Sequence, residues 1–163
     1  MNVDSETVWY QLGREPRGAW RPVVRCRHGA PIVIVTPSAL EDGEPFPTLY
    51  WLTCPTLCKH VSVLESEGAT DAWTSRFADD PGLSERMCAA DEAYRRLRQA
   101  ESADADQCWT VGIAGQQDPL MTKCIHAHTA ANLAGIDDPI GQAVLADLEW
   151  QCDDARCVKG GAV

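Results

Sequence analysis

Cysteine content constrains this chain more than any other feature. Eight cysteines occur among 163 residues, and an even number of thiols could form disulfides. The opening residues, MNVDSETVWYQLGR, lack the basic segment and the apolar stretch of a secretory signal. We therefore expect a cytoplasmic protein in which the thiols stay reduced. In that setting, clustered cysteines serve as metal ligands or reactive thiols, and the others as small core residues.

The remaining composition is that of a folded domain with an acidic surface. Apolar residues make up 45% and charged residues 23% of the chain, so a core can form without disulfides. No apolar run approaches the roughly 20 residues that cross a membrane. A formal net charge of -10 repels nucleic acid and anionic lipid. We expect neither a nucleic acid nor a membrane as partner.

Alternating residues near the N-terminus predict a β-hairpin. Over residues 21–28, basic side chains fall on one face and Cys26 and His28 on the other, which we expect to point inward. The letters HGAP that follow form a turn pattern, and the β-branched run at 32–35 suits a buried return strand. Residues 48–53 (TLYWLT) predict a third strand.

The rest of the chain is mainly helical by pattern. Apolar residues recur at helical spacing in segments that begin at a capping residue or a proline. The expected helices cover about residues 6–12, 55–67, 71–78, 81–100, 123–133 and 139–150. The charged side chains over 81–100, including Asp91 and Arg98, are expected to face solvent. Residues 108–114 fit a short strand.

Together these patterns predict an α+β fold: an N-terminal β-hairpin plus a third strand, packed on a mainly helical C-terminal part. A chain of 163 residues suits one domain, and we expect a single α+β domain over residues 1–150. Residues 151–163 are polar and contain glycine, so we expect a flexible C-terminal tail.

Two segments share a Cys-x-His pattern that predicts metal binding. Cys26 precedes His28 by two residues, and Cys124 precedes His126 by two residues. Residues two apart project to the same side of extended backbone, so either pair could bind one ion. Cys54 sits between a strand and a helix start, where the helix dipole favours its thiolate. Three thiolates and one imidazole form a zinc site, and three thiolates also suit an iron–sulfur cluster.

The spacing leaves the histidine at the second pair open. If Cys124 is already helical, its neighbour on the same face is His128. If the helix begins later, the neighbour is His126. The other cysteines are better explained without metal: Cys58, Cys88 and Cys108 as packing residues, and Cys152 with Cys157 as an incidental exposed pair.

Six segments give the chain a family resemblance. In order, they are QLGREPRG, VVRCRHGAP, PFPTLYWLTCP, VSVLESEG, KCIHAH and DDPIG. Their order resembles the DUF501 family, which comprises small bacterial proteins of undetermined activity, and the resemblance covers roughly residues 11–144. The resemblance therefore brings no catalytic mechanism with it.

What the resemblance implies is which cysteines belong together. Family sequences carry an RC-x-x-G element, an LTCP or LTHP element, and a KCLH element. These correspond here to Cys26, to Cys54, and to Cys124 with His126. A metal-ligand position tolerates exchange of Cys for His, whereas a nucleophile does not. The resemblance therefore favours a metal site.

We expect a metal-binding protein with zinc as first choice and an iron–sulfur cluster as the alternative. The site would join the hairpin to two helix N-termini. The expected ligands are Cys26, Cys54, Cys124 and His126, with His28 as the other candidate histidine.

Two other functions stay open. The chain could be an interaction or assembly subunit with a protein partner, using an arginine-rich N-terminal face made of Arg21, Arg25 and Arg27. It could also be an enzyme with Cys54 as nucleophile and a nearby histidine as base. The sequence alone does not decide whether the protein is an enzyme.

Overall fold

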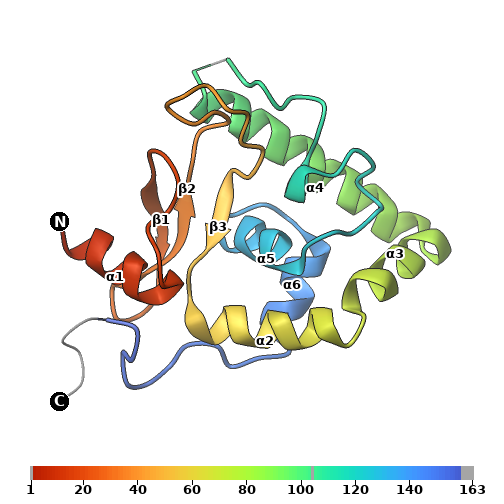
Figure 1. The fold of residues 1–163 in the computed structure, drawn as a ribbon. Helices are drawn as coiled ribbons and strands as arrows, with labels where there is room; N and C mark the ends of the chain where they lie inside the picture. Colours follow the sequence, from red (N-terminus) through yellow and green to blue (C-terminus); the bar gives the residue numbers. More distant parts are fainter. Residues whose placement is uncertain (1, 104, 159–163) are drawn as a thin grey trace.

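The computed structural model describes residues 2–103 and 105–158. Its sheet has three antiparallel strands in the order β1-β2-β3, and most of the helices lie to one side of this sheet (Figure 1). The strands are β1 (Arg21–Arg25), β2 (Pro31–Val35) and β3 (Tyr50–Leu52). The predicted α+β fold, with a hairpin and a third strand against a mainly helical remainder, is confirmed.

Burial of the side chains alternates along the hairpin with the predicted period of two residues. Residues of β1 alternate between exposed and half-buried. The alternation continues beyond the strand, so that Cys26 and His28 are half-buried while Arg25 and Arg27 are exposed. β2 is the central strand and every one of its residues is buried, as its run of β-branched residues predicts.

In residues 2–103 and 105–158, the helical part consists of six α-helices and one 3-10 turn. Most begin where a capping residue or a proline predicts: Asp80 accepts from the Leu83 amide, and Asp138 accepts from the Ile140 amide. The elements are α1 (Val3–Leu12), α2 (Pro55–Ser66), α3 (Ala69–Asp79), α4 (Pro81–Glu101), η1 (Ile113–Gly115), α5 (Ile125–Leu133) and α6 (Pro139–Ala146).

Helix α5 is the centre of the core. It packs against β3, α6, α2 and η1, and in Figure 1 it lies between the sheet and the outer helices. Its approach to α6 is close: a Cβ on Gly141 would lie 2.4 Å from the backbone oxygen of His128. Glycine at this position therefore lets α6 pack directly on α5. The side chains of Ile125 and Ala130 are completely buried there.

The charged face of α4 differs from the prediction. Asp91 and Arg98 are buried, with 3% and 0% of their surface exposed. The segment after α4 folds back over this face, so that Arg98 donates to the Asp106 carboxylate at 2.8 Å and to the carbonyls of Cys108 and Val111 at 2.6 Å. This return of the chain, which helical periodicity does not reveal, covers Asp91 and Arg98. The other charged residues of the face stay exposed as predicted or half-buried, among them Glu85, Glu92 and Arg96.

Three local expectations are corrected. Residues 108–114 form turns and the start of η1 rather than a strand. Helix α5 begins at Ile125 with Cys124 as its N-cap, not after Thr122. Gly68 does not simply end α2: with φ of 88° it links α2 to α3 as the N-cap of α3.

The segment after α6 returns to the hairpin. Figure 1 shows the chain running beneath α2 toward α1, and Cys157 is buried with 4% of its surface exposed. The expectation of an incidental exposed cysteine pair is therefore wrong for Cys157. Residues 159–163 of the predicted tail lie outside the described residues, and the division into a domain and a tail stays a prediction.

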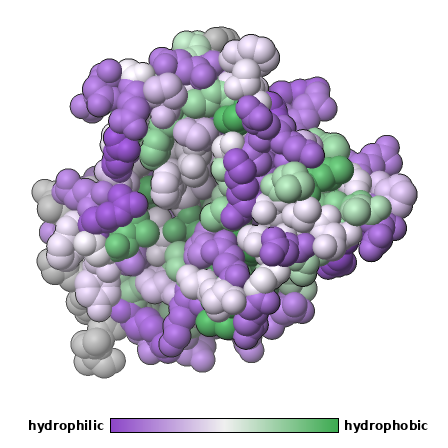
Figure 2. Space-filling model, turned by 45° about the vertical axis from the view of Figure 1, so that its right-hand side comes forward, coloured by the Kyte–Doolittle hydropathy of each residue, from purple (hydrophilic) through white to green (hydrophobic). Residues whose placement is uncertain are grey.

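The outer surface is largely polar. Figure 2 shows hydrophilic residues spread over one face, with hydrophobic residues in small patches between them. The large apolar side chains that are exposed include Trp9, Val63 and Trp109. In the described part of the chain, no helix is both long enough and apolar enough to cross a membrane.

Candidate metal centre

The start of α5 meets the last turn of α2. Cys124 is extended, with φ of -149°, and caps α5, while His126 is the second residue of that helix. The Ile125 amide donates to the Glu65 carboxylate at 2.7 Å. A carboxylate at a helix N-terminus is favoured by the helix dipole. This bond fixes the Glu65 side chain between the two neighbouring residues, Cys124 and His126.

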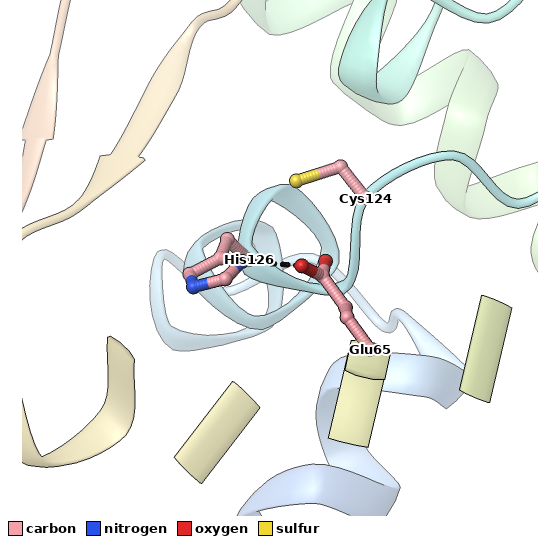
Figure 3. A group of neighbouring side chains, drawn as sticks. All are labelled: Glu65, Cys124 and His126. Carbon is pink, nitrogen blue, oxygen red and sulfur yellow. Dashed lines mark ion pairs between the residues drawn. The ribbon is translucent and has the colours of Figure 1, made fainter. Parts of the chain in front are cut away.

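Three potential metal ligands converge at this junction. Ligand atoms of Glu65, Cys124 and His126 all lie within 4.8 Å of one another (Figure 3). The His126 Nδ1 atom is 3.2 Å from a Glu65 carboxylate oxygen, and both side chains are 27% exposed. The other ring nitrogen of His126 lies 3.2 Å from the Cys58 carbonyl oxygen. The group is therefore held in place from several sides and still reaches solvent.

The surroundings of His126 favour positive charge. A hydrogen bond with the Cys124 sulfur, together with the charge of the Glu65 carboxylate, raises the pKa of His126 to about 9, against the opposing effect of burial. The Cys124 sulfur and the Glu65 carboxylate thus lie beside the imidazole of His126. This arrangement suits a cation, and a divalent metal ion would take the place of the imidazole proton.

The donor set fits zinc. Sulfur from Cys, nitrogen from His and oxygen from a carboxylate are the ligands that Zn²⁺ takes in proteins. Three protein ligands leave one position of a tetrahedral site for water or another group. An iron–sulfur cluster takes mostly Cys thiolates, and this group supplies only one. The residues at the junction therefore suit zinc better than a cluster.

The structure brings together some of the expected ligands and adds one. Cys124 and His126 are in the group, and because α5 begins after Cys124, the neighbour of Cys124 is His126. Cys26, Cys54 and His28 do not belong to this group of ligand atoms. Glu65 was not expected, because nothing in its local sequence distinguishes it from other glutamates of the chain.

His128, the other histidine considered, has a different setting. It is completely buried, and its Nδ1 atom lies 2.6 Å from the Asp138 carboxylate. Asp138 also caps α6 through the amides of Ile140 and Gly141. The His128–Asp138 pair therefore joins α5 to α6 and lies apart from the three-ligand group.

Cys54 occupies the N-cap of α2, as predicted, but its thiol is not activated. Cys54 is 5% exposed. Burial raises the pKa of its thiol, although the backbone amides of Leu57 and Thr56 act to lower it. The expectation that the helix start lowers this pKa is wrong, because desolvation outweighs the two amides. A nucleophilic cysteine needs the reverse, so this geometry gives an enzyme based on Cys54 no support.

The arginines of the predicted partner-binding face are engaged within the chain. Arg21 pairs with Glu101 at 2.6 Å, and Arg25 pairs with Asp4 at 2.8 Å. Arg27 lies 3.3 Å from Asp153. Each guanidinium thus has an intramolecular acid, and recognition of a partner by these arginines stays a prediction.

The remaining cysteines take several roles. Cys58 donates to the Leu52 carbonyl at 3.5 Å, and burial raises its pKa to about 12, so it is a neutral packing thiol as expected. Cys108 is buried and donates to the Ser38 carbonyl. Cys88 is exposed, which differs from the expected packing role because it lies on the outer side of α4.

Comparisons with known proteins place the chain in a family without assigning it an activity. No curated protein and no solved structure matches it. A scan of protein families matches residues 23–146 to the family described as "Protein of unknown function (DUF501)". The match includes Cys26, Cys54 and the whole three-ligand group. Because it covers most of the sequence, the chain belongs to the DUF501 family.

Proposed function

We propose that this protein binds a zinc ion through Glu65, Cys124 and His126. The observation that carries the proposal is the convergence of three ligand atoms within 4.8 Å at the junction of α2 and α5. The thiol must stay reduced to bind metal, which agrees with the cytoplasmic location expected from the sequence.

The ion would join two parts of the fold. Glu65 lies in the last turn of α2, whereas Cys124 caps α5 and His126 lies in its first turn, and α5 is the helix at the centre of the core. Ligands from two helices hold them at a fixed distance, and binding energy then contributes to folding. The partial exposure of the site gives the ion a path from solvent and leaves room for a water as fourth ligand.

The experiment is elemental analysis of the full chain, purified under reducing conditions with zinc in the medium. The His126→Ala and Glu65→Gln variants should each lose one zinc per chain relative to the wild type. Removing a direct ligand should cost more than the roughly 10–100-fold in affinity that outer-shell groups carry. Glu67→Gln is the matched control and should keep its zinc, because Glu67 is the exposed C-cap of the same helix, two residues beyond Glu65.

Two results would contradict the proposal. One is a wild-type protein that folds fully yet contains no zinc and takes up none on titration. The other is equal loss of zinc in Glu67→Gln and Glu65→Gln, since the metal would then respond to the charge of α2 rather than to a ligand.

A further inference from the structure

The face of the sheet that points away from the helical core carries apolar residues of its own. Successive residues of a strand point to opposite faces of a sheet. The ring of Tyr50 packs edge-on against Tyr94 of α4, with ring centroids 6.0 Å apart, so Trp51 points to the other face. Its cross-strand partner is Ile34, which is completely buried but does not belong to the main core cluster. Figure 1 shows α1 beside the hairpin and away from α5.

A cavity of about 260 Å³ lies on this face. Its apolar lining includes Trp51, Phe46 and Leu12. Two segments that give the chain its family resemblance, QLGREPRG and PFPTLYWLTCP, therefore meet here. An apolar cavity of about 150 Å³ binds one benzene ring, and pockets for drug-sized molecules begin at about 300 Å³. The volume of this cavity therefore suits a ligand of one or two fused rings.

The aromatic side chains of the cavity are held in place without a ligand. The Trp51 indole donates to the Thr36 hydroxyl at 3.2 Å, and that hydroxyl donates to the Thr48 carbonyl at 2.6 Å. The Phe46 ring stacks on the indole, with centroids 5.4 Å apart and planes 16° from parallel. Because these rings are already ordered, little rotamer freedom is lost when a ligand binds.

Two exposed arginines also line the cavity. Arg17 pairs with Glu44 at 2.7 Å, and its guanidinium lies over the Phe46 ring at 6.0 Å. Arg14 has no ion-pair partner in the part of the chain that the structure describes. In a chain with a formal net charge of -10, an unpaired arginine beside an apolar cavity is a local site of attraction for an anion.

We propose that this cavity binds a small aromatic carboxylate, with the ring against Trp51 and Phe46 and the carboxylate on Arg14. Aromatic rings pack favourably on other aromatic rings and on guanidinium planes. A guanidinium binds a carboxylate through two parallel hydrogen bonds. One unpaired arginine matches a single negative charge, which favours a carboxylate over a doubly charged phosphate.

Glu44 would limit the affinity for this ligand. Its carboxylate occupies the Arg17 guanidinium and repels a second anion beside it. The cavity therefore has one arginine ready for an anion and one that is held by the chain itself.

This site is separate from the three-ligand group. None of its lining residues is a proposed zinc ligand, and Trp51 points away from the helical core. Zinc content and binding in the cavity can therefore be measured independently, and either proposal can fail without the other.

The test is an NMR titration of the full-length, isotope-labelled protein with naphthoate. Each of the six tryptophans has an indole N–H signal, and a Trp51→Phe variant assigns the signal of Trp51. That signal should shift and saturate with a Kd of about 1 mM or tighter, the affinity expected of a ligand of this size. Trp109, which is 71% exposed and does not line the cavity, is the internal control and should not shift.

The uncharged analogue naphthylmethanol separates the contribution of the charge from that of the ring. Arg14→Gln should weaken naphthoate binding about tenfold, because a hydrogen-bonded charge is lost, and should leave naphthylmethanol binding unchanged. Glu44→Gln should act in the opposite direction, with naphthoate bound roughly two- to fivefold more tightly, because Arg17 is released. Arg96→Gln, which changes an exposed arginine of α4, is the matched control and should alter neither affinity.

Absence of a Trp51 shift at millimolar naphthoate would overturn the proposal. So would equal affinity of the wild type for naphthoate and naphthylmethanol, a comparison that decides even if a variant fails to fold. Sedimentation provides a further check. Self-association of the wild type that Arg14→Gln abolishes would assign the cavity to a second copy of the chain and would also overturn the proposal.

Discussion

Two regions of the molecule differ in how their polar groups are paired. At the far end of α4, the Arg98 guanidinium is completely buried, and it donates to the Asp106 carboxylate and to carbonyls of Pro47, Cys108 and Val111. At the start of α5, ligand groups gather around a partly exposed point that favours positive charge. The first arrangement is satisfied within the chain. In the second, the ligand groups can still bind a metal ion. This difference distinguishes a candidate site from a structural network.

The largest effect is expected at the Arg98 network, whose polar groups are paired within the chain. Arg98→Met should lower the free energy of unfolding by about 3–5 kcal/mol, because it leaves the buried Asp106 charge without its partner. Three backbone carbonyls lose a donor as well. Urea denaturation measures the change.

Arg96→Met is the control for that variant, since Arg96 lies on the same helix and pairs with Glu92 at the surface. Its effect should stay within about 1 kcal/mol. The zinc content of folded Arg98→Met should equal that of the wild type. A loss of metal in that variant would mean that the Arg98 network and the three-ligand group are energetically coupled. That result would contradict the difference drawn between the two regions.

A smaller effect is expected from removal of metal from the three-ligand group at the start of α5. Zinc at 100 times its dissociation constant stabilises a folded protein by about 2.7 kcal/mol per site. A chelator should therefore lower the free energy of unfolding by about this amount. The measurement is urea denaturation with and without the chelator.

Hydrogen exchange locates that effect. Amides near Cys124 and in the last turn of α2 should lose protection when the chelator is added, while amides of the segment bonded to Arg98 should not. Equal loss in both regions would contradict the difference proposed between them.

Local signals predicted most of the fold because the tertiary structure agrees with them. The Asp-Pro pairs at 80–81 and 138–139 mark helix starts, and the alternation in β1 marks its exposed face. The exposure of Arg98 was predicted wrongly, because its burial depends on a loop that returns over α4 and on Pro47, which is 51 residues away in sequence. Periodicity reports the faces of a helix but not which of them a distant segment covers.

The same limit explains what was found and missed at the candidate site. Cys124 and His126 are two residues apart, so spacing alone could pair them. Glu65 is brought to them by packing of α2 on α5, and its bond to the Ile125 amide joins residues 60 positions apart. Cys157 was taken for an exposed residue because a polar sequence does not show that the tail returns to the hairpin.

The smallest expected effect concerns the ion pair between α1 and the hairpin. Arg25 donates to both carboxylate oxygens of Asp4 at 2.8 Å, and its hydrogen bond lowers the pKa of Asp4 below the ordinary value of 3.8. A lowered folded pKa means stability that is present above the unfolded value and is lost as the pH falls through the folded value. Because the pair is partly exposed, Asp4→Asn should cost about 0.2–1 kcal/mol at pH 7.

The pH dependence distinguishes the ion pair from other consequences of the substitution. The difference between Asp4→Asn and the wild type should shrink as the pH falls from 3.8 toward the lower folded pKa, because below the folded value protonation removes the Asp4 charge in both states. Asp4→Asn should also cost less in an Arg25→Gln background, because the guanidinium partner is already absent. A cost that stays constant between pH 7 and pH 3 would assign the effect of Asp4 to the start of α1 rather than to Arg25.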